Sequence, residues 1–266
     1  MEEGLVSMTG HACKGIDLNS DTGERYSFQK ALGEEKLFQN ITSANIACGF
    51  HAGDPVQMAR TVRLCREYGV QVGAHPGLPD PLGFGRRNMD ITPEELGAYL
   101  LYQLGALHHI AGSLGAPVKH VKLHGALYNT VAKDEALARE VIGVIGRISR
   151  DLILVAPFGS VMHGVAVDLG VRVAAEAFAD RAYDRTGALV PRKVAGAVIS
   201  DPDRVVERVL AIVRGEVKTI EGSTLKVQAH TICLHGDTPG ALALAERIRG
   251  ALENEKIPVK CMDSLV

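Results

Sequence analysis

The chain of 266 residues lacks several features that mark common classes of protein. Trp is absent, and no apolar run approaches the roughly 18 residues that a bilayer span requires. The opening MEEGLVSMTG is acidic and has no apolar core of the kind found in a signal peptide. Lys and Arg total 29 against 31 Asp and Glu, so no surplus of positive charge is present to neutralise a nucleic acid backbone. These absences predict a cytoplasmic protein that binds neither membranes nor nucleic acid.

Catalytic and metal-binding signatures are also missing. The five cysteines form an odd set without CxxC spacing, which argues against a disulfide framework and fits a reducing compartment. The sequence contains no HExxH zinc motif, no GxSxG nucleophile elbow and no Walker phosphate loop. Any dependence on ATP would therefore need another chain or an unfamiliar nucleotide site.

What the chain does contain is a repeated pattern of a short apolar run, a polar cluster and a helical segment. This is the rhythm of a parallel α/β sheet, and its length fits one α/β barrel. We expect residues 1–14 to form a loose extension and residues 15–266 to form a single α/β-barrel catalytic domain. The predicted strands are Gly15–Leu18, Ser43–Ala47, Val70–Ala74, His120–Leu123, Leu152–Ala156, Val171–Ala174 and Thr231–Leu234.

Helix starts and a small insertion are predicted from local signals. A capping residue followed by Pro occurs at Asp54, Thr92, Asp201 and Thr238, because the cap satisfies free amides and Pro loses no hydrogen bond there. Glu95 follows Thr92 by three residues and completes a capping box. Between Gly215 and Ala229 two β-prone stretches flank Glu221-Gly222, which predicts a small peripheral hairpin before the last strand.

Polar residues follow these strands, and parallel strands place their carboxyl ends on one rim. Imidazoles and carboxylates gathered there can act as bases, acids or metal ligands. Some have simpler explanations, since Asn45 can stabilise a turn and Asp54 is a helix cap. A divalent ion bound at the rim therefore stays an alternative to metal-free acid–base chemistry. The rim candidates are Asp17, Asn19, Asp21, Asn45, His51, His75, Arg86, Lys122, His124, Glu176 and His235.

Six segments in order carry a resemblance that covers residues 15 to 262. They are DLNSDTGE, SANIACGFHAGD, GAHPGLPDPLGFGRR, KLHGALYN, AEAFADRAYD and CLHGDTPG, and together they resemble the LamB/YcsF family. The family's first motif reads DLNCDLGE, whereas Ser20 and Thr22 stand at its Cys and Leu positions here, which rules out a cysteine nucleophile at residue 20. The resemblance implies a TIM-barrel-like (β/α)7-type barrel similar to that of the glycoside hydrolase and deacetylase group, with the inserted hairpin.

The resemblance also implies a function, which is ATP-dependent cleavage of the lactam of 5-oxo-L-proline to L-glutamate. Two partner subunits, B and C, are implied with it, and ATP would be used through that complex. Two alternatives stay open: a stand-alone metal-dependent deacetylase or amidohydrolase on a carbohydrate-like substrate, and a non-catalytic substrate-binding subunit.

Roles for the rim residues follow as a hypothesis. The catalytic set is Asp17, His51, His75, His124 and Glu176. The substrate-binding set is Asn19, Asn45, Arg86, Lys122 and His235. Asp17 is the candidate base or metal ligand, and any bound metal would be held by Asp17, His51, His75 and His124. Lys122 and Arg86 would hold a substrate carboxylate or a developing phosphate charge through charge-assisted hydrogen bonds.

Overall fold

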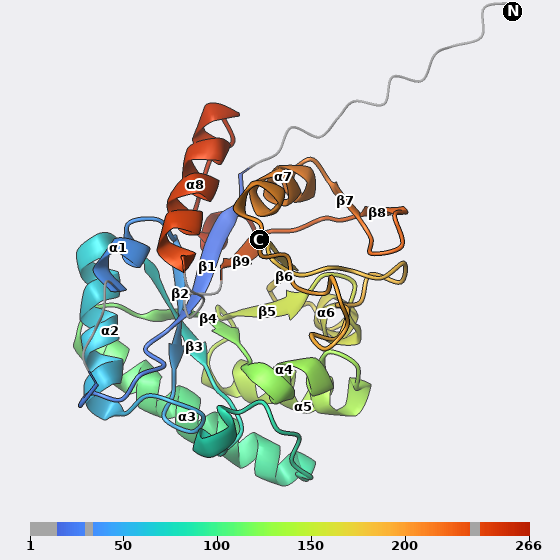
Figure 1. Cartoon of the computed structure of the whole chain (residues 1–266). Helices are drawn as coiled ribbons and strands as arrows, with labels where there is room; N and C mark the ends of the chain where they lie inside the picture. Colours follow the sequence, from blue (N-terminus) through green and yellow to red (C-terminus); the bar gives the residue numbers. More distant parts are fainter. Residues whose placement is uncertain (1–14, 30–33, 235–239) are drawn as a thin grey trace, which may run out of the picture.

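Seven parallel strands close into a barrel in the computed structural model, which describes residues 15–29, 34–234 and 240–266 (Figure 1). The last barrel strand lies between the sixth and the first and so completes the ring. The strands are β1 (Asp17–Thr22), β2 (Ser43–Ala47), β3 (Gln71–His75), β4 (Val118–Lys122), β5 (Ile153–Pro157), β6 (Val173–Phe178) and β9 (Thr231–Leu234). The predicted α/β fold class and parallel barrel are confirmed.

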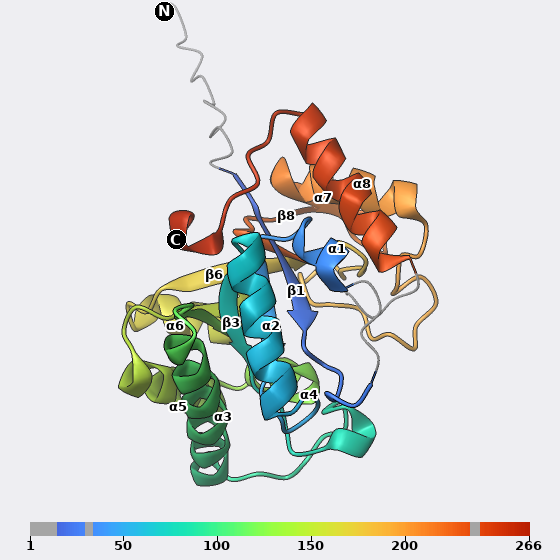
Figure 2. The same ribbon diagram turned by 90° about the vertical axis from the view of Figure 1, so that its left-hand side faces the viewer.

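Helices surround the strands on the outside, as the two perpendicular views show (Figures 1 and 2). Within the described ranges, none of them is long and apolar enough to span a bilayer. The helices are α1 (Glu34–Phe38), α2 (Pro55–Tyr68), α3 (Pro93–Ser113), α4 (Gly125–Val131), α5 (Glu135–Ile148), α6 (Val161–Asp168), α7 (Pro202–Val213) and α8 (Ala241–Asn254), with short 3-10 turns at η1 (Pro81–Gly83) and η2 (Met262–Ser264).

The helix starts follow the predicted caps. Asp54, Thr92 and Asp201 each accept hydrogen bonds from free amides at the start of a helix whose first position is Pro. Thr92 and Glu95 form the capping box of α3. Thr238 lies outside the described residues. Local side-chain chemistry therefore sets where three of the helices begin.

The two faces of the barrel strands carry different chemistry because side chains alternate along a strand. Leu18, Ile46 and Val121 face outward and belong to the main apolar core shared with the helices. Most positions of the opposite parity in β1 to β4 are polar, and several of them hydrogen-bond to a neighbouring strand, for example Asn45 to Asn19 at 2.8 Å. The interior of these four strands is thus a polar network, where other α/β barrels place branched apolar layers.

An apolar plug closes the amino end of the barrel. Ile153, Val155 and Ala174 form a separate buried cluster with Met262 from η2. The Met262 backbone N–H donates to the Asp17 carboxylate at the start of β1. Since this end is sealed, access to the polar interior is left to the carboxyl ends of the strands.

The inserted hairpin is present where it was predicted. β7 (Glu216–Lys218) pairs antiparallel with β8 (Thr224–Lys226), and Val217 faces Leu225. The first barrel strand differs from its prediction, because it runs from Asp17 to Thr22 and includes polar residues that were expected to follow the strand. Its inward side chains are polar, so the hydrophobic pattern stops before the strand does.

Candidate active site

One carboxylate and three imidazoles meet at the carboxyl ends of the first four strands. Glu24 follows β1, His51 follows β2, His75 ends β3 and His124 precedes α4. One ligand atom from each lies within 4.8 Å of the ligand atoms of the others. The His51 and His124 rings stack with centroids 3.7 Å apart. We call these four residues the Glu24 group, and they form a set that is able to hold a metal ion.

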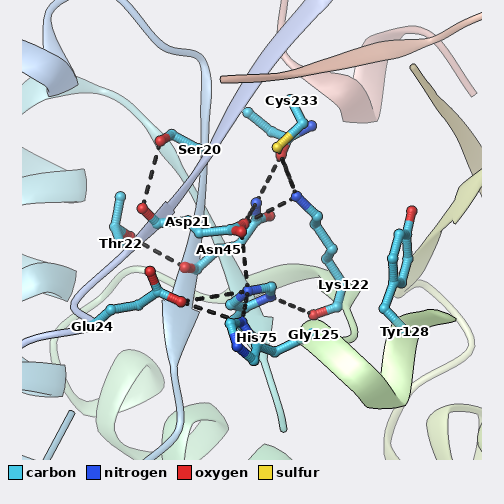
Figure 3. Close-up of polar contacts among 12 residues, drawn as sticks. Ser20, Asp21, Thr22, Glu24, Asn45, His75, Lys122, Gly125, Tyr128 and Cys233 are labelled. Carbon is cyan, nitrogen blue, oxygen red and sulfur yellow. Dashed lines mark hydrogen bonds and ion pairs between the residues drawn. The ribbon is translucent and has the colours of Figure 1, made fainter. Parts of the chain in front are cut away.

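Glu24 reaches this position through a turn. Gly23 has φ 66, a conformation that favours Gly, and it redirects the chain directly after β1. The Glu24 Oε1 atom lies 3.2 Å from His51 Nε2 and 3.3 Å from His124 Nδ1. Figure 3 shows the Glu24 carboxylate pointing toward His75, and the two lie 3.9 Å apart. Three ring nitrogens thus converge on one carboxylate oxygen.

Backbone carbonyls set the tautomers of two of the histidines. His75 Nδ1 lies 2.7 Å from the Lys122 carbonyl, and His124 Nε2 lies 2.8 Å from the Phe84 carbonyl. A carbonyl accepts, so each of these nitrogens carries its ring proton. The other nitrogens, His75 Nε2 and His124 Nδ1, face each other at 2.9 Å. Two bare lone pairs at this distance need a proton or another cation between them.

Protonation in the Glu24 group is set by burial and by the neighbouring charges. Burial raises the pKa of Glu24, but its contacts with His124 and His51 outweigh this effect and lower the value to about 2. Burial lowers the pKa of His51 to about 4 against its contact with Glu24. Burial also lowers the pKa of His75, but Asp21, at 3.3 Å, reverses this and the net direction is upward. The group therefore holds an ionised carboxylate and a neutral His51 near neutral pH.

A second charged network lies next to the Glu24 group, inside the barrel (Figure 3). Lys122 Nζ is 3.0 Å from Asp21 Oδ1 and 2.9 Å from Glu176 Oε1. Burial lowers the pKa of Lys122, but Asp21, Cys233 and Glu176 outweigh it and hold the pKa well above its usual range. Glu176 also accepts a 2.6 Å hydrogen bond from the Tyr128 hydroxyl. Lys122 is therefore a buried ammonium held between two carboxylates.

Members of both groups line a common cavity of about 260 Å³, whereas Glu24 and His51 line a neighbouring pocket with Tyr26 and Phe84. His75 and His124 of the Glu24 group line the common cavity together with Asp21 and Lys122. Phe178 and Tyr128 add apolar surface, and Arg86 lies on the same wall. A small molecule in this cavity would contact imidazole, ammonium and guanidinium groups at once.

Most of the predicted residues come together, and Asp17 does not. One group contains His51, His75 and His124. A second, inside the barrel, contains Lys122, Asn19, Asn45 and Glu176. Arg86 lines the cavity. Asp17 lies at the amino end of β1, where it accepts hydrogen bonds from Thr42, Ser43 and Thr231. This placement corrects the expectation that Asp17 lies with the histidines, and Glu24 contacts them instead. His235 lies outside the described residues.

Three polar residues of the site were not assigned roles from the sequence. Glu24 belongs to DLNSDTGE but follows the strand by a turn, and Asp21 is the third of three alternating polar residues of β1. His120 lies inside the barrel, 2.8 Å from Asn45 Oδ1, and burial lowers its pKa to about 3. A Cβ at Gly73 would lie 2.0 Å from the His120 ring, so Gly73 makes room for it. Glu24 had a signal in its motif, whereas His120 had none beyond its strand.

Comparisons with known proteins agree on one family. A sequence model of the LamB/YcsF family matches residues 16–266. A protein of Syntrophobacter fumaroxidans, named as the A subunit of 5-oxoprolinase, is 51% identical, over 92% of this chain and 98% of its own. A Pyrococcus abyssi protein with the same name is 51% identical, over 92% of this chain and 96% of its own. The crystal structure of a lactam utilization protein from Thermus thermophilus is 42% identical and superposes with a TM-score of 0.88, covering 93% of this chain and 99% of that one.

Proposed function

The chain belongs to the LamB/YcsF family, and from that premise we propose that it is the A subunit of a cytoplasmic 5-oxoprolinase. It would open the lactam of 5-oxo-L-proline to give L-glutamate, with ATP hydrolysis supplied through partner subunits B and C. The relatives that carry the name of this 5-oxoprolinase component support the proposal at about half identity over nearly the whole chain. The observation that carries the proposal is that His75 and His124 of the Glu24 group line one cavity together with Lys122.

Opening a lactam needs three things at one carbon. Water must lose a proton as its oxygen adds to the carbonyl carbon, the carbonyl oxygen must be stabilised, and the ring nitrogen must gain a proton as the C–N bond breaks. An unactivated amide resists this attack. Transfer of the γ-phosphoryl group of ATP to the lactam oxygen within the complex, with release of ADP, would activate the carbon, and phosphate would be released after water adds. This chain would contribute the proton transfers and the electrostatic stabilisation.

The residues divide these tasks by charge. Glu24 is ionised and contacts three imidazoles, so it is the candidate acceptor of the proton from water. His75, whose pKa is raised, is the candidate donor to the leaving nitrogen. Lys122 keeps its charge while buried and lines the cavity, so it can stabilise a developing oxyanion.

The same group fits a divalent metal ion. His75 and His124 present bare nitrogens because carbonyls hold their other nitrogens, which is the way metal-binding histidines are oriented. Three imidazoles and one carboxylate favour Zn²⁺ or a related transition ion over Mg²⁺ or Ca²⁺. Such an ion would supply a Lewis acid that lowers the pKa of a nearby water.

The test uses the assembled enzyme. The chain is purified with its two partner subunits, ATP-dependent formation of glutamate from 5-oxoproline is measured, and bound metals are determined on the same sample. Glu24→Gln removes the converging charge and should lower turnover by about 10²–10⁴-fold, with loss of any bound metal. Glu221→Gln, in the exposed hairpin turn, is the matched control and should behave as the wild type. Full turnover in Glu24→Gln would exclude the proposed role of this residue.

The Glu24 group also favours a second candidate, a stand-alone metal-dependent amidohydrolase. A metal-activated water would need neither ATP nor partner subunits. Turnover of N-acetylated sugars by the isolated chain, without ATP, would support this candidate. ATP-dependent turnover of 5-oxoproline that requires all three subunits would exclude it.

A further inference from the structure

The cavity beside the Glu24 group is rich in guanidinium groups. Arg86, Arg181 and Arg192 line it together with Lys122. Among the described residues that line it, Asp21 is the single carboxylate, against these four cationic side chains. The wall therefore carries excess positive charge, which suits an anionic ligand.

Arg181 is the most informative of these residues because it is buried and incompletely bonded. Its exposed fraction is 8%, and its Nη2 donates a 2.7 Å hydrogen bond to the Val190 carbonyl. Its Nε is buried and has no hydrogen-bond partner. A buried guanidinium with an unsatisfied donor is costly unless another group satisfies it.

The fold holds Arg181 in place. The segment between β6 and α7 forms an excursion from the barrel. Within it, the backbone of Arg181 pairs with that of Val198, and Tyr183 pairs with Leu189, as isolated antiparallel β-bridges. The buried side chains of Ala182, Val190 and Ala197 pack together within it. The excursion is therefore packed as a unit, and it brings Leu189 and Arg192 to the same cavity wall as Arg181.

The electrostatics of Arg181 also favour an anion. Burial lowers the pKa of Arg181, and the positive charge of Arg192 lowers it further. Asp180 acts in the opposite direction and offsets part of this. An anion between Arg181 and Arg192 would relieve their mutual repulsion.

We propose that Arg181, assisted by Arg192 and Arg86, forms a subsite that binds the carboxylate of the substrate. The planar fork of Arg181 can present Nε to one carboxylate oxygen while the adjacent nitrogen faces the other. The identification of this carboxylate as that of 5-oxoproline rests on the proposed function. With the carboxylate on Arg181, the lactam ring would extend within the same cavity toward Lys122, His75 and His124.

The experiment compares ligands that differ in the carboxylate alone. Binding of 5-oxo-L-proline, of 2-pyrrolidinone, which lacks the carboxylate, and of inorganic phosphate is measured by calorimetry on the full chain. Arg181→Gln should weaken 5-oxoproline by about 10- to 100-fold and leave 2-pyrrolidinone unchanged. Arg192→Gln, at an exposed position, should weaken 5-oxoproline by a smaller factor. Arg150→Gln, exposed in the turn before β5, removes the same charge away from the cavity and should change neither ligand.

The outcomes separate the subsite from the proposed function. Arg181→Lys keeps a cation and a donor for Val190, and near-ultraviolet circular dichroism checks that each variant retains native packing. Wild-type affinity for 5-oxoproline in folded Arg181→Gln, or equal weakening of both lactams, overturns the subsite. Loss of phosphate binding alone would assign Arg181 to a phosphoryl group and would overturn the carboxylate assignment. If the assembled complex does not consume 5-oxoproline while its binding still depends on Arg181, the proposed function fails and the subsite stands.

Discussion

At the scale of single residues, the barrel interior separates structural charges from charges that face the cavity. Asp17, Asn19 and Asp21 lie on the same face of β1 because side chains alternate along a strand. Asp17 faces three hydroxyl groups at the sealed end, whereas Asp21 meets Lys122 and His75 at the open end. Depth along one strand thus decides whether a carboxylate supports the fold or the site.

Asp17 predicts a pH dependence of stability. Burial, partly offset by its hydrogen bonds, raises its pKa from 3.8 to about 6 in the folded chain. The folded state then binds more protons than the unfolded state between these values, so the free energy of unfolding falls as pH rises through this range. The loss amounts to about 3 kcal/mol. Asp17→Asn should remove this component, as urea unfolding at about pH 4 and about pH 7 would show.

The control for this prediction is an exposed carboxylate. Asp168→Asn, at the end of α6, should keep the wild-type difference in stability between the two pH values. An unchanged difference in Asp17→Asn would mean that the buried carboxylate does not titrate in this range. Activity is not expected to follow Asp17, because its contacts lie at the end of the barrel away from the cavity.

At the scale of elements, local signals predicted positions well and failed where the tertiary environment decides. Two strands have the predicted bounds, Ser43–Ala47 and Thr231–Leu234. Each consists mainly of apolar or small residues and is bounded by turn signals. The predicted bounds of β1 lie too close to the N-terminus. Its inward side chains are polar, and only the closed barrel provides their hydrogen-bond partners. The position of Glu24 depends on the left-handed turn at Gly23, and no periodicity in the sequence reveals that turn.

The three histidines were predictable as a set, because each follows a strand and parallel strands share a rim. Their tautomers were not, since these depend on carbonyls of Lys122 and Phe84 that the sequence does not place. The burial of Arg181 could not be predicted from the sequence either, because it depends on how the segment after β6 packs.

A substitution at Gly85 tests how closely its loop packs on the Glu24 group, and a substitution at Gly105 is the control. Gly85 has φ 62, and a Cβ there would lie 2.7 Å from His51 and 2.8 Å from His124. Gly85→Ala should therefore displace both rings and lower turnover by at least about tenfold. Gly105, within α3, has open space around it, so Gly105→Ala should raise the free energy of unfolding by about 0.5–1 kcal/mol and leave turnover unchanged. Wild-type turnover in Gly85→Ala would show that the rings tolerate displacement.

At the scale of the whole molecule, the barrel brings together side chains from four consecutive strand ends that lie far apart in the sequence. Glu24 and His124 are separated by 99 intervening residues yet lie 3.3 Å apart. Closure of the ring by β9 between β6 and β1 places Cys233 against Lys122 at 3.1 Å and Thr231 against Asn19 at 2.7 Å. The site is therefore a property of the closed barrel, and its integrity should follow global unfolding.

This coupling predicts that an ion bound by the Glu24 group stabilises the entire molecule. A ligand that binds the folded chain alone adds RT ln(1 + [L]/Kd) to the free energy of unfolding, which is about 2.7 kcal/mol at a hundredfold excess over Kd. The chain is first freed of metal with a chelator, which is then removed. Titration of this metal-free chain with Zn²⁺ should raise the unfolding temperature of the wild type. The increase should be much smaller in Glu24→Gln. Glu221→Gln should show the wild-type increase, because Glu221 is not one of the four ligands. Equal increases in all three proteins would place the bound zinc outside the Glu24 group and leave acid–base chemistry by Glu24 and His75 as the account of this site.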